Sequence, residues 1–447
     1  MIAIRTKVLF LILCFVEAIW LLVAQVLGNT ALLLPCLGCF LALAVWSAIK
    51  GMALPVFLFF LPFAPLLKIR PGAISFFTIA LIAVYLVYLA KSFKKTEIYH
   101  LVPGLLVIAL TFVVKAGYGY DIDNSYLLFA LSLLLVPFLS KEAGKQYDFF
   151  WLTLYFSFGI AFAAITAQYL AVFPTISRYI GTKVLLGVVR RSGYYGDPNF
   201  YSAHITAAFS AVLVLIVNTA RKRKVVLLFL LAMLLLYCGL LSVSKMFLLV
   251  AVCLILFWMV DFIFKKGKLS LKLMILLTFA VGAVFLLSST VFTDLIDQLL
   301  ARFLRDNSLS DFTTRRSELW LQYLRTFAEN PAVLWFGHGY TAVTVNGRAS
   351  HNTVIQGLFQ FGITGCTLLA AWAVCFARAF LAGIKVRLNI LTQIFILLIG
   401  TFGPWMALDY FFFDEFFLIP LFACVGIAFV AEASAKRETE DDKGSGI

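Results

Sequence analysis

Long apolar runs, separated by short polar segments, follow one another along almost the whole chain. A helix needs about 20 mostly apolar residues to cross the roughly 30 Å hydrocarbon core of a bilayer, and most of these runs approach or exceed that length. We therefore predict an all-α polytopic membrane protein with about 12–14 transmembrane helices. The predicted spans lie near residues 7–27, 31–49, 52–67, 73–90, 101–115, 125–139, 149–173, 200–218, 225–242, 245–264, 271–289, 352–382, 390–408 and 413–431.

The predicted number of spans is a range because the pair between residues 31 and 67 is irregular. Pro55, Pro62 and Pro65 interrupt it, and proline removes a backbone donor and kinks or ends a helix. The first apolar run has Arg5 and Lys7 before it and no small-x-small cleavage site after it. We interpret that run as a retained first span.

The long polar stretch at about 290–350 contains a helical pattern of its own. Apolar side chains recur there at i, i+1, i+4, i+5 and i+8, the spacing of an amphipathic helix that could lie against the bilayer or cap the bundle. They are Leu319, Trp320, Tyr323, Leu324 and Phe327.

Composition agrees with the pattern of apolar runs. Of the 447 residues, 63% are hydrophobic and 13% are charged, and the mean hydropathy is +1.01. Soluble domains are about 45–50% apolar and about 25% charged. Lipid is therefore the expected solvent for most of this chain.

The net charge of +14 is spread over short clusters between the apolar runs, so we expect no nucleic-acid partner. Alternate gaps collect the positive charge, which is the distribution that marks the cytoplasmic side. Both termini, including a solvated tail at 432–447, then lie inside, and the segments at 118–124, 174–199 and 290–350 lie outside. The clusters that fix this orientation are Arg5 and Lys7, Lys50, Lys91 to Lys95, Lys141 and Lys145, Arg221 to Lys224, Lys265 to Lys268, Lys385 and Arg387, and Lys436 and Arg437.

Nothing in the sequence predicts a metal site or a nucleotide site. The eight cysteines lie in or beside apolar runs, and Cys36 and Cys39 have no second Cys or His pair. Asp121 and Asp123 form an Asp-x-Asp segment without a second acidic cluster, and the chain has no Walker loop. We expect no metal and no cofactor.

Three polar islands on the predicted outer side are the candidate functional residues. The first includes Arg190, Arg191, Asp197 and Asn199 and runs directly into a span. Its two glycines and its Asp-Pro-Asn turn stand before a helix, whose N-terminal dipole attracts anions. Asp197 or Asn199 could equally serve only as the helix N-cap.

The other two islands follow the long polar stretch. Arg315 and Arg316 begin the amphipathic helix, where they could also pair with Glu318 or with lipid phosphate. His351 and Asn352 open a long apolar run, and the helix dipole there favours a neutral imidazole that can accept a proton. His338, between two glycines, is the rival candidate base.

Together the islands offer arginines for bidentate phosphate binding and one neutral base. Such a set suits transfer from a diphosphate-activated donor, because arginines can hold the leaving diphosphate while a histidine deprotonates an attacking hydroxyl.

In order and spacing these segments resemble the O-antigen ligase and O-antigen polymerase superfamily of bacterial membrane glycan transferases. The resemblance covers residues 190–370 and includes an arginine before Gly193 and an Asp-Pro-Asn turn, followed by an Arg-x-x-x-Trp helix. The matching segments are Arg191 to Asn199, Arg316 to Trp320, Asn330 and Pro331, Gly337 and Gly339, His351 and Asn352, and Phe361 to Gly365.

The resemblance implies a GT-C-like fold and an inverting, metal-independent glycosyltransferase in the bacterial cytoplasmic membrane, with its active site on the extracytoplasmic face. The donor would be a glycan on undecaprenyl diphosphate, gripped by Arg191 and Arg316, with His351 as the base. Both arginines are doubled, so Arg190 and Arg315 could take these roles instead. Asp197, Asn199, Asn352 and His338 would support the site. Partners would be the lipid bilayer and the lipid-linked glycan, and could include other polysaccharide-assembly proteins.

We expect a surface-polysaccharide polymerase first, a ligase that moves finished glycan to a lipid or protein acceptor second, and a flippase or other transporter as the alternative of another class. A transporter should carry charged residues deep in its spans. The expected division of the chain is an N-terminal transmembrane bundle at 1–173, a core at 174–382 that includes the loop at 290–350, C-terminal helices at 383–431, and the tail.

Overall fold

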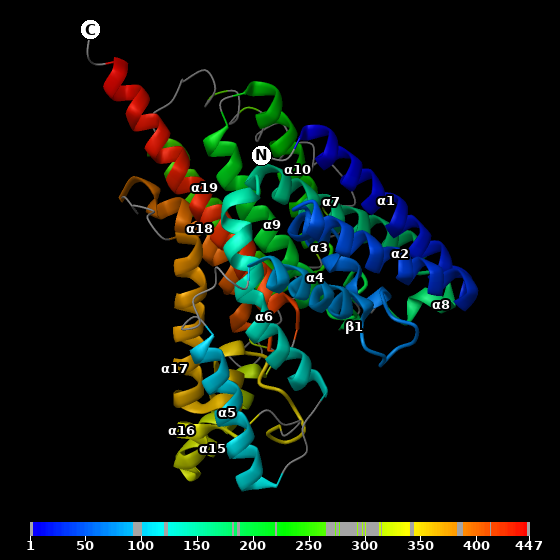
Figure 1. Ribbon diagram of the computed structural model, residues 1–447, viewed down its shortest axis with the longest axis vertical. Helices are drawn as coiled ribbons and strands as arrows, with labels where there is room; N and C mark the ends of the chain where they lie inside the picture. The colour runs from blue at the N-terminus through cyan, green and yellow to red at the C-terminus, as the bar shows by residue number, and fades with distance from the viewer. Residues whose placement is uncertain are drawn as a thin grey trace.

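The structure is a computed structural model that describes residues 3–92, 101–119, 124–180, 183–185, 188–219, 221–264, 313, 315–339, 344–381, 388–411 and 413–444, with isolated residues between 273 and 300. It is a helical bundle with one short hairpin (Figure 1). The helices are α1 Ile4–Leu27, α2 Thr30–Ile49, α3 Ala53–Phe60, η1 Leu61–Leu66, α4 Phe76–Ser92, α5 Val102–Tyr118, α6 Asn124–Gln146, α7 Phe149–Leu170, α8 Pro174–Ser177, α9 Pro198–Asn218, α10 Lys222–Leu240, α11 Lys245–Phe264, α15 Arg316–Glu329, α16 Pro331–Phe336, α17 Thr353–Leu381, η4 Leu388–Ile390, α18 Leu391–Phe402, η5 Gly403–Met406 and α19 Glu415–Gly444; the strands are β1 Lys183–Leu185 and β2 Val188–Arg190.

The prediction of a polytopic helical membrane protein is confirmed. In the described part of the chain, nine helices are long and apolar enough to cross a membrane, and four shorter apolar helices stand beside them. The shorter helices lie at four of the predicted spans. One of them is short because of the prolines noted above: α3 ends at Phe60, and the chain continues as the 3-10 helix η1 through Pro62 and Pro65. The span predicted at 271–289 lies outside the described residues.

Several helices begin and end where local chemistry requires it. The side chains of Asn29 and Asp148 accept hydrogen bonds from backbone N–H groups in the first turns of α2 and α7. Gly28 and Gly119 end α1 and α5 in the left-handed conformation, with φ of 60° and 69°. In lipid these caps matter more than in water, because no solvent can satisfy the free backbone groups.

Helix α9 lies at the centre of the bundle. Nearly all of its residues are buried, and it packs against α7, α10, α11, α18 and α19. Every residue of α3 is buried as well. One continuous apolar core extends from Phe10 in α1 to Ala431 in α19.

The two ends of the bundle differ. Figure 1 shows both termini at its upper end and α15 and α16 at its lower end. A separate apolar cluster of Leu319, Tyr323, Phe327, Val333 and Phe359 joins α15, α16 and α17 there. Which end faces the cytoplasm remains a prediction from charge.

The predicted amphipathic helix is confirmed as α15. Leu319, Tyr323 and Phe327 are buried on its inner face, whereas Leu324 is exposed. The helix lies over the end of the bundle because this apolar face covers α17.

The long apolar run at 352–382 is not one straight helix. Gly362 has φ 63° and ψ −178°, a conformation that only glycine adopts readily, and it kinks α17. A Cβ at this position would lie 2.5 Å from the backbone nitrogen of Phe336, so the kink also lets α16 approach closely.

A close contact between α3 and α7 gives a test of this packing. A Cβ at Gly159 would lie 2.9 Å from the Cα of Phe59 and would overlap its carbonyl oxygen. We expect Gly159→Ala to destabilise the protein by about 1–3 kcal/mol, seen as a lower thermal-unfolding midpoint in detergent.

Gly38→Ala is the matched control for Gly159→Ala. Gly38 also lies inside a helix, α2, and a Cβ there would meet no atom within 4 Å. An equal loss of stability in both variants would contradict the packing of α3 on α7.

Candidate functional site

The first polar island forms a buried network between β2, α9 and the turn after α10. Arg190 donates from Nε to the carbonyl oxygen of Ser242 (3.2 Å) and from Nη2 to Oδ1 of Asn199 (3.3 Å). Ser244 donates to the same Oδ1 at 2.8 Å. Arg190 is only 7% exposed. Its guanidinium therefore connects β2 to α9 and to the turn after α10.

Arg191, the other member of this pair, is differently placed. Its backbone N–H donates to the carbonyl oxygen of Leu241 (3.0 Å), which fixes the start of the loop. The side chain is half-buried, and the part of the chain that the structure describes offers it no hydrogen-bond acceptor or ion pair. Of Arg190 and Arg191, only Arg191 therefore has side-chain N–H groups that the described residues leave available to a ligand.

Asp197 is the N-cap of α9, as its sequence context allowed. Its side chain accepts from the backbone N–H of Asn199 at 2.7 Å, and Pro198 occupies the first turn. Its charge also acts on Arg316, 119 positions later in the sequence. The first and second islands therefore lie close together.

Arg316 is the first residue of α15 and reaches back into the bundle. Its Nη1 donates to the carbonyl oxygen of Ala407 at 2.7 Å. Burial lowers the pKa of the Arg316 guanidinium, and the charge of Asp197 partly opposes that shift. Arg315, by contrast, is exposed, with φ 61°. Within this doubled pair, Arg316 is the residue that belongs to the polar site.

One direct hydrogen bond joins the third island to the second. The indole N–H of Trp320 donates to the carbonyl oxygen of Ser350 at 2.9 Å. Asn352 caps α17 by accepting from the backbone N–H groups of Val354 (3.0 Å) and Ile355 (3.1 Å). Its Nδ2 lies 4.0 Å from the sulfur of Met406, the residue before the acceptor of Arg316.

His351 stands between these contacts. It is half-buried and has φ 51°, in the left-handed region. A non-glycine residue in this region stores backbone strain, which the surrounding structure must hold in place and which clusters at functional sites.

His338, the rival base, lies in an aromatic environment. Its backbone N–H donates to the carbonyl oxygen of Phe359, and its ring lies 4.6 Å from that of Phe359 and 5.3 Å from that of Tyr118. Burial lowers the pKa of this imidazole and keeps it neutral at pH 7. These contacts give His338 a packing role between α5 and α17.

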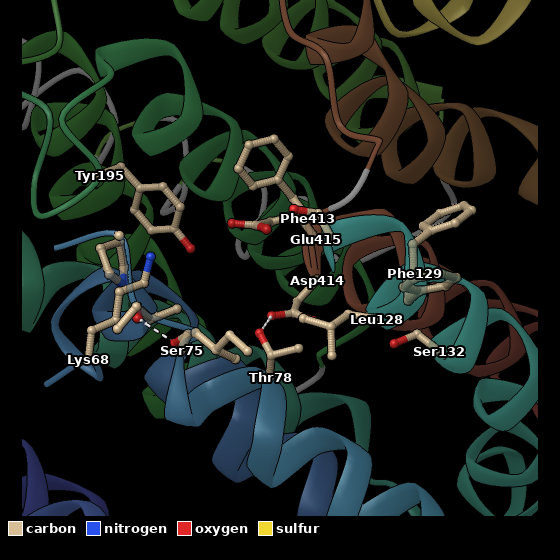
Figure 2. Close-up of a pocket in the computed structure, with 17 residues that line it drawn as sticks. Lys68, Ser75, Thr78, Leu128, Phe129, Ser132, Tyr195, Phe413, Asp414 and Glu415 are labelled. Atoms are coloured by element: carbon tan, nitrogen blue, oxygen red, sulfur yellow. Dashed lines mark hydrogen bonds between the residues drawn. The ribbon is translucent and has the colours of Figure 1, made fainter. Parts of the chain in front are cut away.

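A cavity of about 570 Å³ opens beside the first island (Figure 2). Tyr195, in the loop between Arg191 and Asp197, forms one wall, and Asp414 and Glu415 form another. Thr78 donates to Oδ2 of Asp414 at 2.8 Å. The remaining lining residues are Ala64, Pro65, Lys68, Gly72, Ala73, Ile74, Ser75, Ser125, Leu128, Phe129, Ser132, Phe413 and Phe417.

Glu415 is buried under this cavity beside a histidine. Its Oε1 lies 3.1 Å from Nε2 of His204 in α9, and both side chains are buried. Burial raises the pKa of the neighbouring Tyr195 hydroxyl well above its ordinary value, with Glu415 as the next cause, so Tyr195 stays neutral.

Sequence reasoning missed the residues of this cavity. A signal was present, since Asp409, Asp414 and Glu415 are three carboxylates within seven positions in a chain with only 22. That density between two apolar runs indicates a polar site, but it does not reveal Thr78 or Lys68 as neighbours.

Among the described residues, no three His, Cys, Asp or Glu side chains gather as metal ligands. Asp121 and Asp123 lie outside that part of the chain. Comparisons with protein-family models, curated proteins and solved structures find no match to this chain. Membership of the superfamily that the sequence resembles therefore remains a prediction.

The contrast between Arg190 and Arg191 predicts that only the substitution of Arg190 lowers stability. Arg190→Ala should destabilise the protein by about 1–3 kcal/mol, because it leaves the buried carbonyl of Ser242 without this donor. Arg191→Ala should leave the thermal midpoint nearly unchanged. Equal midpoints for the two variants, measured in the same detergent, would contradict these different roles.

The loop before α19 predicts a pH effect. Desolvation raises the pKa of Asp409 to about 7, although its Oδ1 accepts from the backbone N–H of Phe411. The folded protein then holds a proton that the unfolded chain, with a pKa of about 3.9, releases, so this residue costs stability as pH rises from about 4 to 7.

Asp409→Asn should therefore raise the thermal midpoint at pH 8 and leave it almost unchanged at pH 4. The difference between variant and wild type isolates Asp409 from the neighbouring Asp414. A variant that is less stable than wild type at pH 8 would refute this assignment.

Proposed function

We propose that this chain is a membrane glycan transferase, with a GT-C-like arrangement of helices, that uses a glycan on undecaprenyl diphosphate as donor. The observation that carries the proposal is the convergence of the three polar islands. Asp197 acts on Arg316, Arg316 contacts Ala407, and Asn352 lies against Met406. In the sequence, Asn199 of the first island precedes Arg316 of the second by 117 positions, and His351 of the third follows Arg316 by 35.

The residues divide into roles that suit such a transfer. Arg191 and Arg316 are the cations that would bind the diphosphate, Arg191 because its side chain has donors to spare and Arg316 because a single carbonyl takes one of its five N–H groups. The hydrogen bonds of Arg190 and Asn199 fix the position of the loop at 190–199. Asn352 fixes the start of α17, and with it His351.

The reaction would be an inverting displacement. The acceptor hydroxyl oxygen attacks the anomeric carbon, the bond from that carbon to the diphosphate oxygen breaks, and the hydroxyl proton passes to the imidazole of His351. The arginines stabilise the negative charge that develops on the leaving diphosphate. We place the site on the extracytoplasmic face of a bacterial cytoplasmic membrane, with both termini in the cytoplasm, from the charge distribution.

A polymerase that joins lipid-linked repeat units is the first expectation, and a ligase that moves finished glycan to another acceptor is the second. Deleting the gene separates them by the length of glycan left on the lipid carrier. Loss of polymer supports a polymerase, whereas full-length polymer retained on its carrier supports a ligase.

A transporter of lipid-linked glycan is the alternative from another class, and one observation favours it. Two carboxylates lie buried within membrane-spanning helices, Asp261 beside Gln393 (3.0 Å) and Glu17 beside Cys36 (3.2 Å). Glu17 lies near the middle of α1, where a charged group is costly and often functional, whereas Asp261 lies in the last turn of α11. Neither belongs to the converging islands.

Single substitutions test the site assignment. We expect Arg191→Ala, Arg316→Ala and His351→Ala each to lower polymer by about 10²-fold, because each removes a group that acts on the diphosphate or the acceptor. The readouts are polymer length on gels and the amount of protein in the membrane.

Arg325→Ala is the matched control, since Arg325 is an exposed arginine on the same helix as Arg316. It should leave the polymer unchanged. Wild-type polymer in all three site variants, at equal protein levels, would exclude this site.

A further inference from the structure

The cavity of about 570 Å³ beside the converging islands has no part in the diphosphate site proposed above. Its size falls within the range of small-ligand pockets, about 300–1,000 Å³. It brings together η1, the loop before α4, α6, the loop at 190–199 and the start of α19. The lining therefore comes from four distant parts of the sequence, at 64–78, 125–132, 195 and 413–417, around a partly open cavity.

The charges around this cavity do not suit a diphosphate. Asp414 and Glu415 stand against a single cation, Lys68, so the wall carries no excess of positive charge (Figure 2). A diphosphate would face carboxylates there, whereas the arginines lie in the adjoining site. The cavity instead suits a ligand with many uncharged hydrogen-bonding groups.

The hydroxyls in the wall donate within the protein, Ser75 to the carbonyl oxygen of Ala64 (2.9 Å) and Tyr195 to that of Leu61 (2.8 Å), so their oxygens can accept from the hydroxyls of a ligand. Figure 2 shows Lys68, Ser75, Thr78, Tyr195 and Asp414 around one open space. Thr78 holds the Asp414 carboxylate through Oδ2 at 2.8 Å. The carboxylate is thereby fixed in orientation before a ligand arrives, which reduces the entropy lost on binding.

Aromatic rings supply the apolar part of the wall. Phe129, Phe413, Phe417 and Tyr195 line the cavity. Phe129 and Phe417 are only 3% and 4% exposed, so Phe413, 43% exposed, and the half-buried Tyr195 are the rings that a ligand can reach. Phe413 is itself supported by the ring of Phe200, 4.8 Å away. A sugar ring offers both kinds of surface that this wall needs, hydroxyls at its edge and C–H groups on its faces.

We propose that this cavity binds a saccharide unit, with Asp414 accepting from sugar hydroxyls, Lys68 donating to sugar oxygens, and the aromatic rings packing on the sugar face. Given the proposed function, on which this extension rests, the unit is the acceptor end of a glycan. The reacting hydroxyl would then approach from the cavity, while the diphosphate of the donor lies on the arginines.

Saturation-transfer difference NMR on the full-length protein in nanodiscs tests this proposal, because the method detects weak sugar binding. The probes are neutral hexoses, N-acetylhexosamines, their methyl glycosides and their disaccharides. We expect saturation of at least one probe by the wild type. Asp414→Asn should weaken its binding by about tenfold or more, through loss of a carboxylate oxygen that accepts a hydrogen bond.

Asp409→Asn is the matched control, since Asp409 is a desolvated carboxylate in the same loop that does not line the cavity. It should bind the probe as the wild type does. Lys68→Gln is a second test variant in case Asp414→Asn does not fold, and it should also weaken binding. Circular dichroism and gel filtration establish that each variant is folded.

The proposal is overturned if the folded wild type binds none of the probes, or if binding is equal in wild type, Asp414→Asn and Lys68→Gln. Arg316→Ala separates this result from the proposed function. Sugar binding that survives in Arg316→Ala while polymer is lost supports both. Sugar binding in a chain that neither lengthens lipid-linked glycan nor transfers it to another acceptor supports the cavity and refutes the transferase.

Discussion

Lipid offers no hydrogen bonds, so polar groups that are buried in this bundle need partners within the protein. The segment between α18 and α19 meets that constraint for most of the site. Ala407 accepts from Arg316, Leu408 accepts from Thr353 at 2.7 Å, Asp414 accepts from Thr78, and Glu415 lies against His204. These contacts connect this segment to α15, α17, α4 and α9.

This arrangement explains why the polar islands come together. Arg316 and Asn352 are separated in the sequence, but they contact consecutive residues of that segment. Arg316 contacts Ala407, and Asn352 contacts Met406. The same segment then turns into the cavity wall at Asp414. The arginine site and the cavity therefore share one support, and a displacement of the segment would disturb both.

The doubled arginines show how one sequence feature can hold two functions. Arg190 is buried in hydrogen bonds to Ser242 and Asn199, whereas the side chain of the next residue, Arg191, is half-buried and takes no part in that network. The second pair has the opposite order. Arg315, the first arginine, is exposed, whereas Arg316, the second, reaches into the bundle. The spacing to a motif residue could not show which arginine of a pair belongs to the site, because the side chains of adjacent residues point in different directions.

Much of the fold could be predicted from the sequence, since the bilayer imposes span length and apolar composition directly. Helix α15 followed from its apolar spacing, and Asp197 was recognised as a possible cap. The kink at Gly362 could not be predicted, because it depends on the close approach of α16. Nor could the pairs of the cavity wall, since Thr78 and Asp414 are 336 positions apart. Only packing brings such residues together.

Glycan transfer by the purified protein is the most direct test of the proposed reaction. The protein is reconstituted in vesicles with a defined oligosaccharide on undecaprenyl diphosphate, and lipid-linked glycans are separated by length. We predict longer lipid-linked glycan together with one released undecaprenyl diphosphate for each bond formed. Glycan that crosses the vesicle bilayer with its length unchanged, and no released diphosphate, would contradict it and indicate a transporter.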